Sequence, residues 1–148
     1  MQTILDKTTR DALINRINTV NETNKPQWGK MNVYQMLKHC RLSEEMFSGK
    51  LVCKRMFIGR LLGRIALKGS SKDEKPMMRN AMTSPELMVK ETTGDLLSER
   101  SKCIALIEEH ENFSTHNFIH PFFGKMTKEQ IGILAYKHID HHLRQFNA

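Results

Sequence analysis

The stretch HPFFGKMTKEQIGILAYKHIDHHLRQF, residues 120–146, decides how the chain is expected to fold. Thr127 and, three residues later, Gln130 form the pattern of a capping box, which begins a helix. The positions at helical spacing that follow are Ile131, Leu134, Ala135, His138, His142 and Gln145. We therefore predict a C-terminal helix with histidines on or beside its buried face, where a histidine is costly unless its ring nitrogens have partners.

Two helices are expected in the N-terminal third of the chain. The first is capped by Thr8 or Thr9 and runs to about Val20. The second begins at Asn32, which forms a capping box with Gln35, and ends near residues 48–49. Its inward positions are Val33, Met36, Leu37, Cys40 and Phe47, with His39 near the edge of that face.

The middle of the chain is strongly basic. Between Lys50 and Arg79 nine cations are opposed only by Asp73 and Glu74, so this segment carries the whole net charge of +7. Residues 55–68 within it are expected to form a shorter helix, although two glycines weaken that prediction. We interpret the segment as a solvated cationic face over apolar helix stems, with binding to nucleic acid or to an anionic membrane as the alternative. Nucleic-acid binding is not expected, because no helix-turn-helix, RNP or zinc-finger signature is present.

The second half of the chain contributes one more helix before the C-terminal one. It is expected from about Asp95 to His110, after an exposed loop at 69–76 and an irregular stretch at 76–92. Its inward positions are Leu96, Leu97, Cys103, Ile104 and Ile107. With no period-2 strand, the pattern predicts an all-α fold in one domain, residues 1–148: a four-helix bundle with an extra short basic helix or irregular segment after the second helix.

Other features of the sequence bear on the cellular location of the protein. The first residues contain no apolar stretch of the kind a signal peptide needs, and the longest apolar runs are too short for a transmembrane segment. The three cysteines are far apart and form no CxxC. We therefore expect reduced thiols in a cytoplasmic protein.

The histidines of the C-terminal helix suggest a metal site. His138 and His142 are four residues apart, so they lie one turn, about 5.4 Å, apart on one side of the helix. Two imidazoles so placed can bind one ion, and a third ligand must then come from elsewhere. His39 is the best candidate, because its helix opens after the same GKM phrase and it lies near the inward stripe. Three neutral histidines leave a coordination position open, as catalytic sites do.

Other assignments of these polar residues stay open. A histidine pair at this spacing is more often a surface pair or a satisfied pair than a ligand pair. His141 can replace His142, while Asp140 or Gln145 can accept from a ring N–H, although exposure at the bundle edge is the commoner outcome. His120 either lines a cleft beside the last helix or has a structural role in a turn. The two remaining histidines, His110 and His116, are expected to be solvated.

Several phrases resemble the DinB/YfiT-like superfamily. They are WGKM at 28–31 with QMLKHC at 35–40, and HPFFGKMTKEQ at 120–130 leading to KHIDHHLRQF at 137–146. The middle of the chain matches only loosely, in its basic segment and in TSPEL at 83–87. The resemblance implies a bacterial four-helix bundle with a three-histidine metal site, which falls on His39, His138 and His142.

The resemblance also implies a range of activities. Some relatives are metal-dependent transferases that use a low-molecular-weight thiol such as bacillithiol or mycothiol, and others have no known activity. A thiol transferase or hydrolase using zinc, nickel, iron or manganese is the first expectation, with the cationic residues 55–79 as a candidate site for an acidic thiol. The alternative is a non-catalytic, stress-related or partner-binding module without bound metal. A homodimer is plausible because the first three helices carry apolar residues that look exposed.

Overall fold

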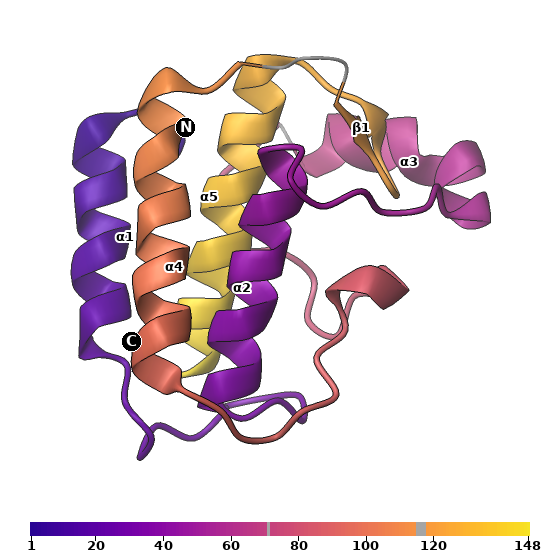
Figure 1. Ribbon diagram of the computed structural model, residues 1–148. Helices are drawn as coiled ribbons and strands as arrows, with labels where there is room; N and C mark the ends of the chain where they lie inside the picture. Colours follow the sequence, from indigo (N-terminus) through magenta and orange to yellow (C-terminus); the bar gives the residue numbers. More distant parts are fainter. Residues whose placement is uncertain (71, 115–117) are drawn as a thin grey trace.

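The computed structural model describes residues 1–70, 72–114 and 118–148 of the chain. Four long helices form a bundle (Figure 1), and they are α1 (Lys7–Thr19), α2 (Val33–Phe47), α4 (Leu96–Glu109) and α5 (Lys128–Gln145). In the bundle α1 and α5 run in one direction, and α2 and α4 run in the other. A fifth helix, α3 (Phe57–Ser70), lies beside the bundle. The expected all-α bundle with an additional basic helix is confirmed.

Local sequence signals set where the helices begin. Capping boxes are present at Asn32 with Gln35 and at Thr127 with Gln130, as expected. The expected cap of the first helix is wrong, because Asp6 caps α1 by accepting from the backbone N–H of Thr9 at 3.1 Å. Aspartate is as good a cap as threonine, and the residue nearer the N-terminus extends the helix.

The core lies between the four long helices. Its side chains with almost no exposure include Ile4, Leu13, Ile17, Met36, Leu37, Ile107, Ile131, Ile139, Leu143 and Phe146. Cys40 and Cys103 are buried among them as unpaired thiols, as expected. Leu97 was expected inward but is 66% exposed, because it falls on the outer side of the first turn of α4.

The connections differ most from expectation. The expected loop at 69–76 starts late, because α3 continues to Ser70, and residue 71 lies outside the described residues. Residues 76–92 are irregular apart from the single turn η1 (Pro85–Leu87). A second turn, η2 (His110–Asn112), follows α4.

No strand was expected, yet a two-stranded hairpin precedes α5. Strand β1 (Ile119–His120) pairs antiparallel with β2 (Gly124–Lys125), and His120 lies opposite Gly124. Arg55 holds this hairpin from the start of α3, since its Nη1 donates to the carbonyl oxygens of Pro121 at 2.5 Å and Phe122 at 2.7 Å. Strands of two residues are too short to show the alternation of apolar and polar residues that identifies a strand in a sequence. The arginine that holds them in place is also far away along the chain.

The helices of the described residues differ in length or hydropathy from membrane-spanning helices. None of those in residues 1–70, 72–114 and 118–148 combines the length and the apolar composition that crossing a membrane requires.

Candidate metal centre

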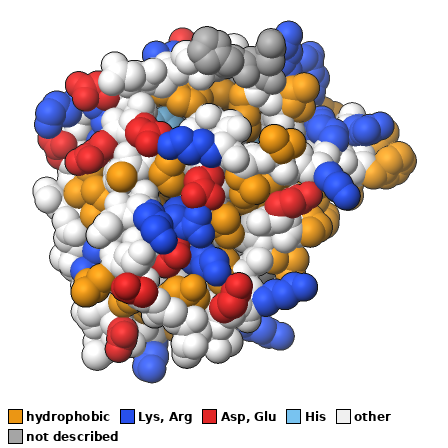
Figure 2. Space-filling model, viewed as in Figure 1, with side chains coloured by type: hydrophobic (Ala, Val, Ile, Leu, Met, Phe, Trp, Pro, Cys, Tyr) orange, Lys and Arg blue, Asp and Glu red, His pale blue; other side chains and the backbone are white. Residues whose placement is uncertain are grey.

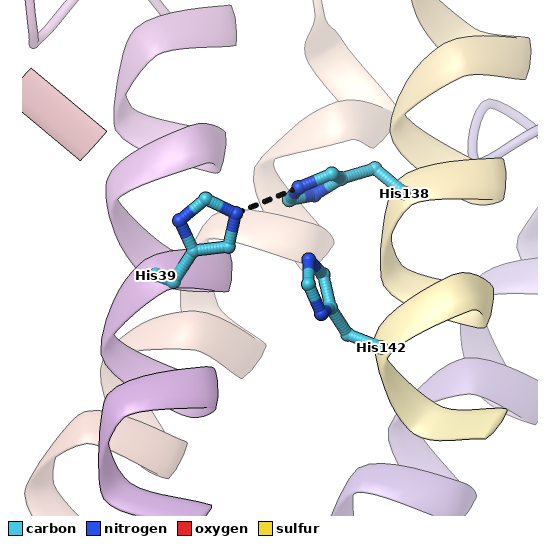
Figure 3. Close-up of side chains that lie close together, drawn as sticks. All are labelled: His39, His138 and His142. Atoms are coloured by element: carbon cyan, nitrogen blue, oxygen red, sulfur yellow. Dashed lines mark hydrogen bonds between the residues drawn. The ribbon is translucent and has the colours of Figure 1, made fainter. Parts of the chain in front are cut away.

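Three histidines from two helices meet inside the bundle. His39 projects from α2, and His138 and His142 project from the antiparallel α5 toward it (Figure 3). One ring nitrogen from each lies within 4.8 Å of the other two, and the ring centroids are 4.7–5.0 Å apart. The structure therefore brings together residues that are about a hundred positions apart in the sequence and that could hold a metal ion.

A backbone carbonyl orients the ring of His39. Its Nδ1 lies 2.8 Å from the carbonyl oxygen of Leu87, the last residue of η1. A carbonyl oxygen can only accept, so Nδ1 carries the proton and Nε2 keeps its lone pair. The lone pair of Nε2 is on the side that faces α5. No pattern around TSPEL could reveal this acceptor, because a backbone carbonyl has no sequence signature.

A glutamine orients the ring of His142 in the same way. His142 Nδ1 lies 2.9 Å from Oε1 of Gln145, and Nε2 of Gln145 donates to the carbonyl oxygen of Trp28 at 2.7 Å. The Trp28 carbonyl fixes which end of the amide is the acceptor, so His142 Nδ1 is protonated and its Nε2 is not. Gly29 adopts φ +79°, and a Cβ built there would lie only 2.8 Å from Nε2 of Gln145, so glycine is required for this close approach.

The third ring, His138, leaves a donor or an acceptor without a partner. Its Nε2 lies 3.0 Å from Nε2 of His39, and its Nδ1 is buried with no hydrogen-bond partner among the residues described. If His138 keeps its proton on Nδ1, two lone pairs face each other across 3.0 Å. If the proton is on Nε2, the buried Nδ1 is an unpaired acceptor. A cation at the centre removes the first conflict.

Burial keeps these imidazoles neutral. It lowers the pKa of His39, and it lowers the pKa of His142 to about 3, with the neighbouring His39 adding to the effect. The pKa of His138 is lowered well below its usual value by burial and by the other histidines. Neutral imidazole is the form that binds metal ions, so the three side chains are ready to bind a cation without losing a proton.

The distances fit a small divalent ion. Donors bound at about 2.0 Å around a tetrahedral ion lie about 3.3 Å from one another. Nε2 of His39 and Nε2 of His138 are 3.0 Å apart, and one nitrogen from each of the three rings lies within 4.8 Å of the other two, so small ring rotations reach that arrangement. The donor set of three imidazoles suits zinc, nickel, iron and copper better than magnesium or calcium.

The other residues expected near the site lie around it. His141 is half-buried and packs its ring against Trp28 at 5.3 Å, outside the cluster of three. Asp140 was expected at the bundle edge or as an acceptor for a ring N–H, and instead it is buried. Asp140 forms ion pairs with Arg16 at 2.7 Å and with Arg144 at 2.8 Å. These two guanidinium groups stabilise the charge of the buried carboxylate.

Two further histidines lie outside the cluster and form hydrogen bonds within the fold. His120 Nδ1 accepts from the backbone N–H groups of Phe122 and Phe123, both at 3.1 Å, in the turn of the hairpin. Burial, with nearby Arg55, lowers the pKa of His120 to about 3.

His110 was expected to be solvated, and that expectation is wrong. It is buried with its Nε2 2.6 Å from Oε2 of Glu44, a carboxylate on the other side of α2 from His39. The pairing is invisible in the sequence because the two residues are far apart. The last histidine, His116, lies outside the described residues.

A large cavity lies elsewhere in the molecule. It has a volume of about 630 Å³ and is lined by residues that include Phe47, Cys53, His110, Phe113 and Phe118. The three clustered histidines do not line it. A ligand of the cluster must therefore approach by another face, where His138 is partly exposed.

The sequence matches a known family model over nearly its whole length. The family model described as "Protein of unknown function (DUF1569)" matches residues 2–148. No curated protein and no solved structure matches the chain. The match spans nearly the whole chain, so the three clustered histidines all lie within it.

Proposed function

We propose that this protein, which belongs to the family described as "Protein of unknown function (DUF1569)", binds one divalent metal ion through His39, His138 and His142. The observation that carries the proposal is the convergence of three neutral imidazoles with no carboxylate in the cluster. Two of them have their Nδ1–H donated to fixed acceptors, so their Nε2 lone pairs are available. Such second contacts orient metal-binding histidines generally.

We further propose that the family is a branch of the DinB/YfiT-like superfamily. The bundle and the three histidines, two of them on the last helix, support this relationship. This relationship supports an enzymatic role as a thiol-dependent transferase or a hydrolase. A cytoplasmic location fits the three unpaired cysteines.

The chemistry of such an enzyme would divide between the ion and the chain. A divalent ion with an open position lowers the pKa of a bound water or thiol and so supplies a nucleophile near neutral pH. The chain holds the three imidazoles in place through Leu87 and Gln145 and keeps the site largely dry, since His39 and His142 are 6% and 7% exposed. A measured turnover of an electrophilic substrate in the presence of a thiol would distinguish an enzyme from a non-catalytic metal-binding protein.

Thermal unfolding tests the metal proposal. At a free ion concentration 100 times the dissociation constant, binding stabilises the native state by about 2.7 kcal/mol. For a chain of this size that raises the unfolding midpoint by about 5–10 °C. The metal-free protein is titrated with zinc, nickel, iron and manganese in separate experiments, using chain without a histidine tag.

A neighbouring histidine provides the control. His138→Ala should abolish the rise in midpoint, whereas His141→Ala, one turn along α5 and outside the cluster, should keep it. If none of the four metals shifts the midpoint of the natural chain, or if His138→Ala keeps the full shift, the proposal is wrong.

A further inference from the structure

Helix α3 presents an apolar surface to solvent. Its residues fall into rows at four-residue spacing, and one row, Gly59, Gly63 and Leu67, is buried against the rest of the protein. Most of the other side chains that are large and apolar point away from the protein. Their exposed fractions are Phe57 77%, Ile65 70%, Leu61 66%, Leu62 50% and Ile58 40%. A surface helix normally buries such a face and exposes its polar one, so α3 is oriented the opposite way.

The orientation of α3 is fixed by its attachments. A Cβ built at Gly59 or Gly63 would overlap the carbonyl oxygen of Phe122, so these glycines let the helix backbone lie directly on the hairpin turn. Arg55 ties the start of the helix to the same turn. Lys137 ties its end to α5 by donating to the carbonyl oxygen of Ser70 at 2.8 Å. Rotating the apolar face inward would break all of these contacts.

A row of cations borders the apolar face. Arg60, Arg64 and Lys68 lie at four-residue spacing next to the row of Phe57, Leu61 and Ile65, and all three are exposed. None of the three forms an ion pair with an acidic residue of the described part of the chain, and α3 itself contains no acidic residue. In Figure 2 hydrophobic and Lys or Arg side chains gather on the protruding right-hand side, where Figure 1 places α3.

We propose that α3 docks this protein on the surface of a lipid bilayer that contains anionic lipids. The occupant must accept an apolar face about 20 Å long and also neutralise the cations beside it. The boundary between acyl chains and anionic headgroups offers both, and an amphipathic helix with cations on its polar side is typical of helices that lie in that boundary. The helix would lie flat on the bilayer, and the rest of the protein would stay outside it.

A second copy of the chain fits this face less well. Pairing two α3 helices through their apolar faces would bring six cations of Arg60, Arg64 and Lys68 together with no acidic residue on either helix to pair with them. Like charges in contact weaken such an interface. The charge pattern therefore favours an anionic partner.

Co-sedimentation with vesicles tests the proposal on the full chain. Vesicles of phosphatidylglycerol with phosphatidylcholine should bind the protein at least about tenfold more tightly than vesicles of phosphatidylcholine alone, and added salt should weaken the binding. The double variant Leu61→Ser with Ile65→Ser should lose at least about tenfold in affinity for the anionic vesicles, because the inserted apolar area is reduced. Arg60→Glu with Arg64→Glu should lose a similar factor.

Matched substitutions on α4 are the controls. Leu97 is 66% exposed, as is Leu61, so Leu97→Ser should leave vesicle binding unchanged. Lys102→Glu, at an exposed position of the same helix, should cost far less than the charge reversals on α3. The unfolding midpoint of each variant, measured without vesicles, shows whether the fold is kept, and all six substituted positions in the four variants are exposed.

The proposal is overturned if the natural chain does not bind the anionic vesicles. It is also overturned if Leu61→Ser with Ile65→Ser binds them as tightly as the natural chain, since the contact would then be electrostatic alone. Analytical ultracentrifugation adds a third outcome. A dimer that the same double variant converts to a monomer, without vesicle binding, would assign the face to a second copy.

Discussion

Two buried histidine contacts lie on opposite sides of helix α2, and the chemical group that faces the imidazole differs between them. On the side toward α5, His39 meets two other imidazoles at ring centroid distances of 4.9–5.0 Å. On the other side, Glu44 meets His110, with its Oε2 2.6 Å from Nε2 of the ring. The first contact has no anion within it, and the second has a carboxylate with a fully buried side chain.

This difference separates a structural contact from a candidate binding site. In the Glu44 pair, Oε2 of the carboxylate accepts the N–H of His110, while Oε1 of Glu44 and Nδ1 of His110 are buried without a partner among the described residues. Three imidazoles offer each other lone pairs, and the buried Nδ1 of His138 has no partner among the described residues. Only the cluster of three imidazoles has a donor set that a cation would complete. Burial alone therefore does not identify the functional histidines, whereas the identity of the group they face does.

The largest effect on stability is expected at the Glu44 pair. Glu44→Ala removes the partner of a buried imidazole and leaves a cavity beside it, so it should destabilise the protein by about 3–5 kcal/mol. Denaturant unfolding of the metal-free protein measures this change. Glu45→Ala, the next residue, breaks only the partly exposed pair with Arg41 and should cost less than about 1 kcal/mol. Equal costs for the two variants would contradict the structural role assigned to Glu44.

The contact that orients His142 should affect metal binding more than folding. Gln145→Met keeps the size of the side chain but removes the acceptor for His142 Nδ1, so the affinity for zinc should fall about 10–100-fold. Titration calorimetry on the folded variant measures it. Arg144→Ala, at the neighbouring position and paired among the described residues only with Asp140, should leave the affinity unchanged. An unchanged affinity in Gln145→Met would remove the glutamine from the site.

A smaller effect is expected from pH on the metal-free protein. Burial lowers the pKa of His142 to about 3, below the unfolded value of about 6.5. Between these values the unfolded chain binds a proton that the native chain does not. Stability is therefore complete above about pH 6.5 and falls as the pH is lowered, by about 1.4 kcal/mol per pH unit for this histidine.

The variant His142→Leu isolates that contribution. Its free energy of unfolding, compared with that of the natural chain between pH 6.5 and pH 4, should fall less steeply by about 1.4 kcal/mol per unit. Parallel curves for the two proteins would show that His142 is not held neutral by burial.

Much of the fold could be predicted because its signals are local. The capping boxes at Asn32 and Thr127 lie within four residues of sequence, and both begin helices in the structure. The orientation of α3 could not be predicted, because its apolar residues suggest a buried face and only the hairpin turn at Phe122 shows which row of the helix is covered. The short strands could not be predicted for the same reason, since Arg55, which holds them in place, is far away in the sequence.

Part of the candidate site could likewise be predicted from the sequence, and part could not. The spacing of His138 and His142 on one helix is a local feature, and His39 followed from its place near the inward stripe together with the family resemblance. The acceptors that orient the rings include the carbonyl of Leu87, which any residue type would provide. The pairing of His110 with Glu44 joins the end of one helix to the last turn of another, so a residue that looked solvated is buried.

The most direct test of the central claim is the metal stoichiometry of the purified chain. Untagged protein is loaded with zinc, freed of excess ion and measured by elemental analysis beside the triple variant His39→Ala, His138→Ala and His142→Ala. One zinc per natural chain and none per variant is the predicted result. No zinc in the natural chain, or as much in the variant as in the natural chain, would contradict the claim that the three imidazoles form a metal site.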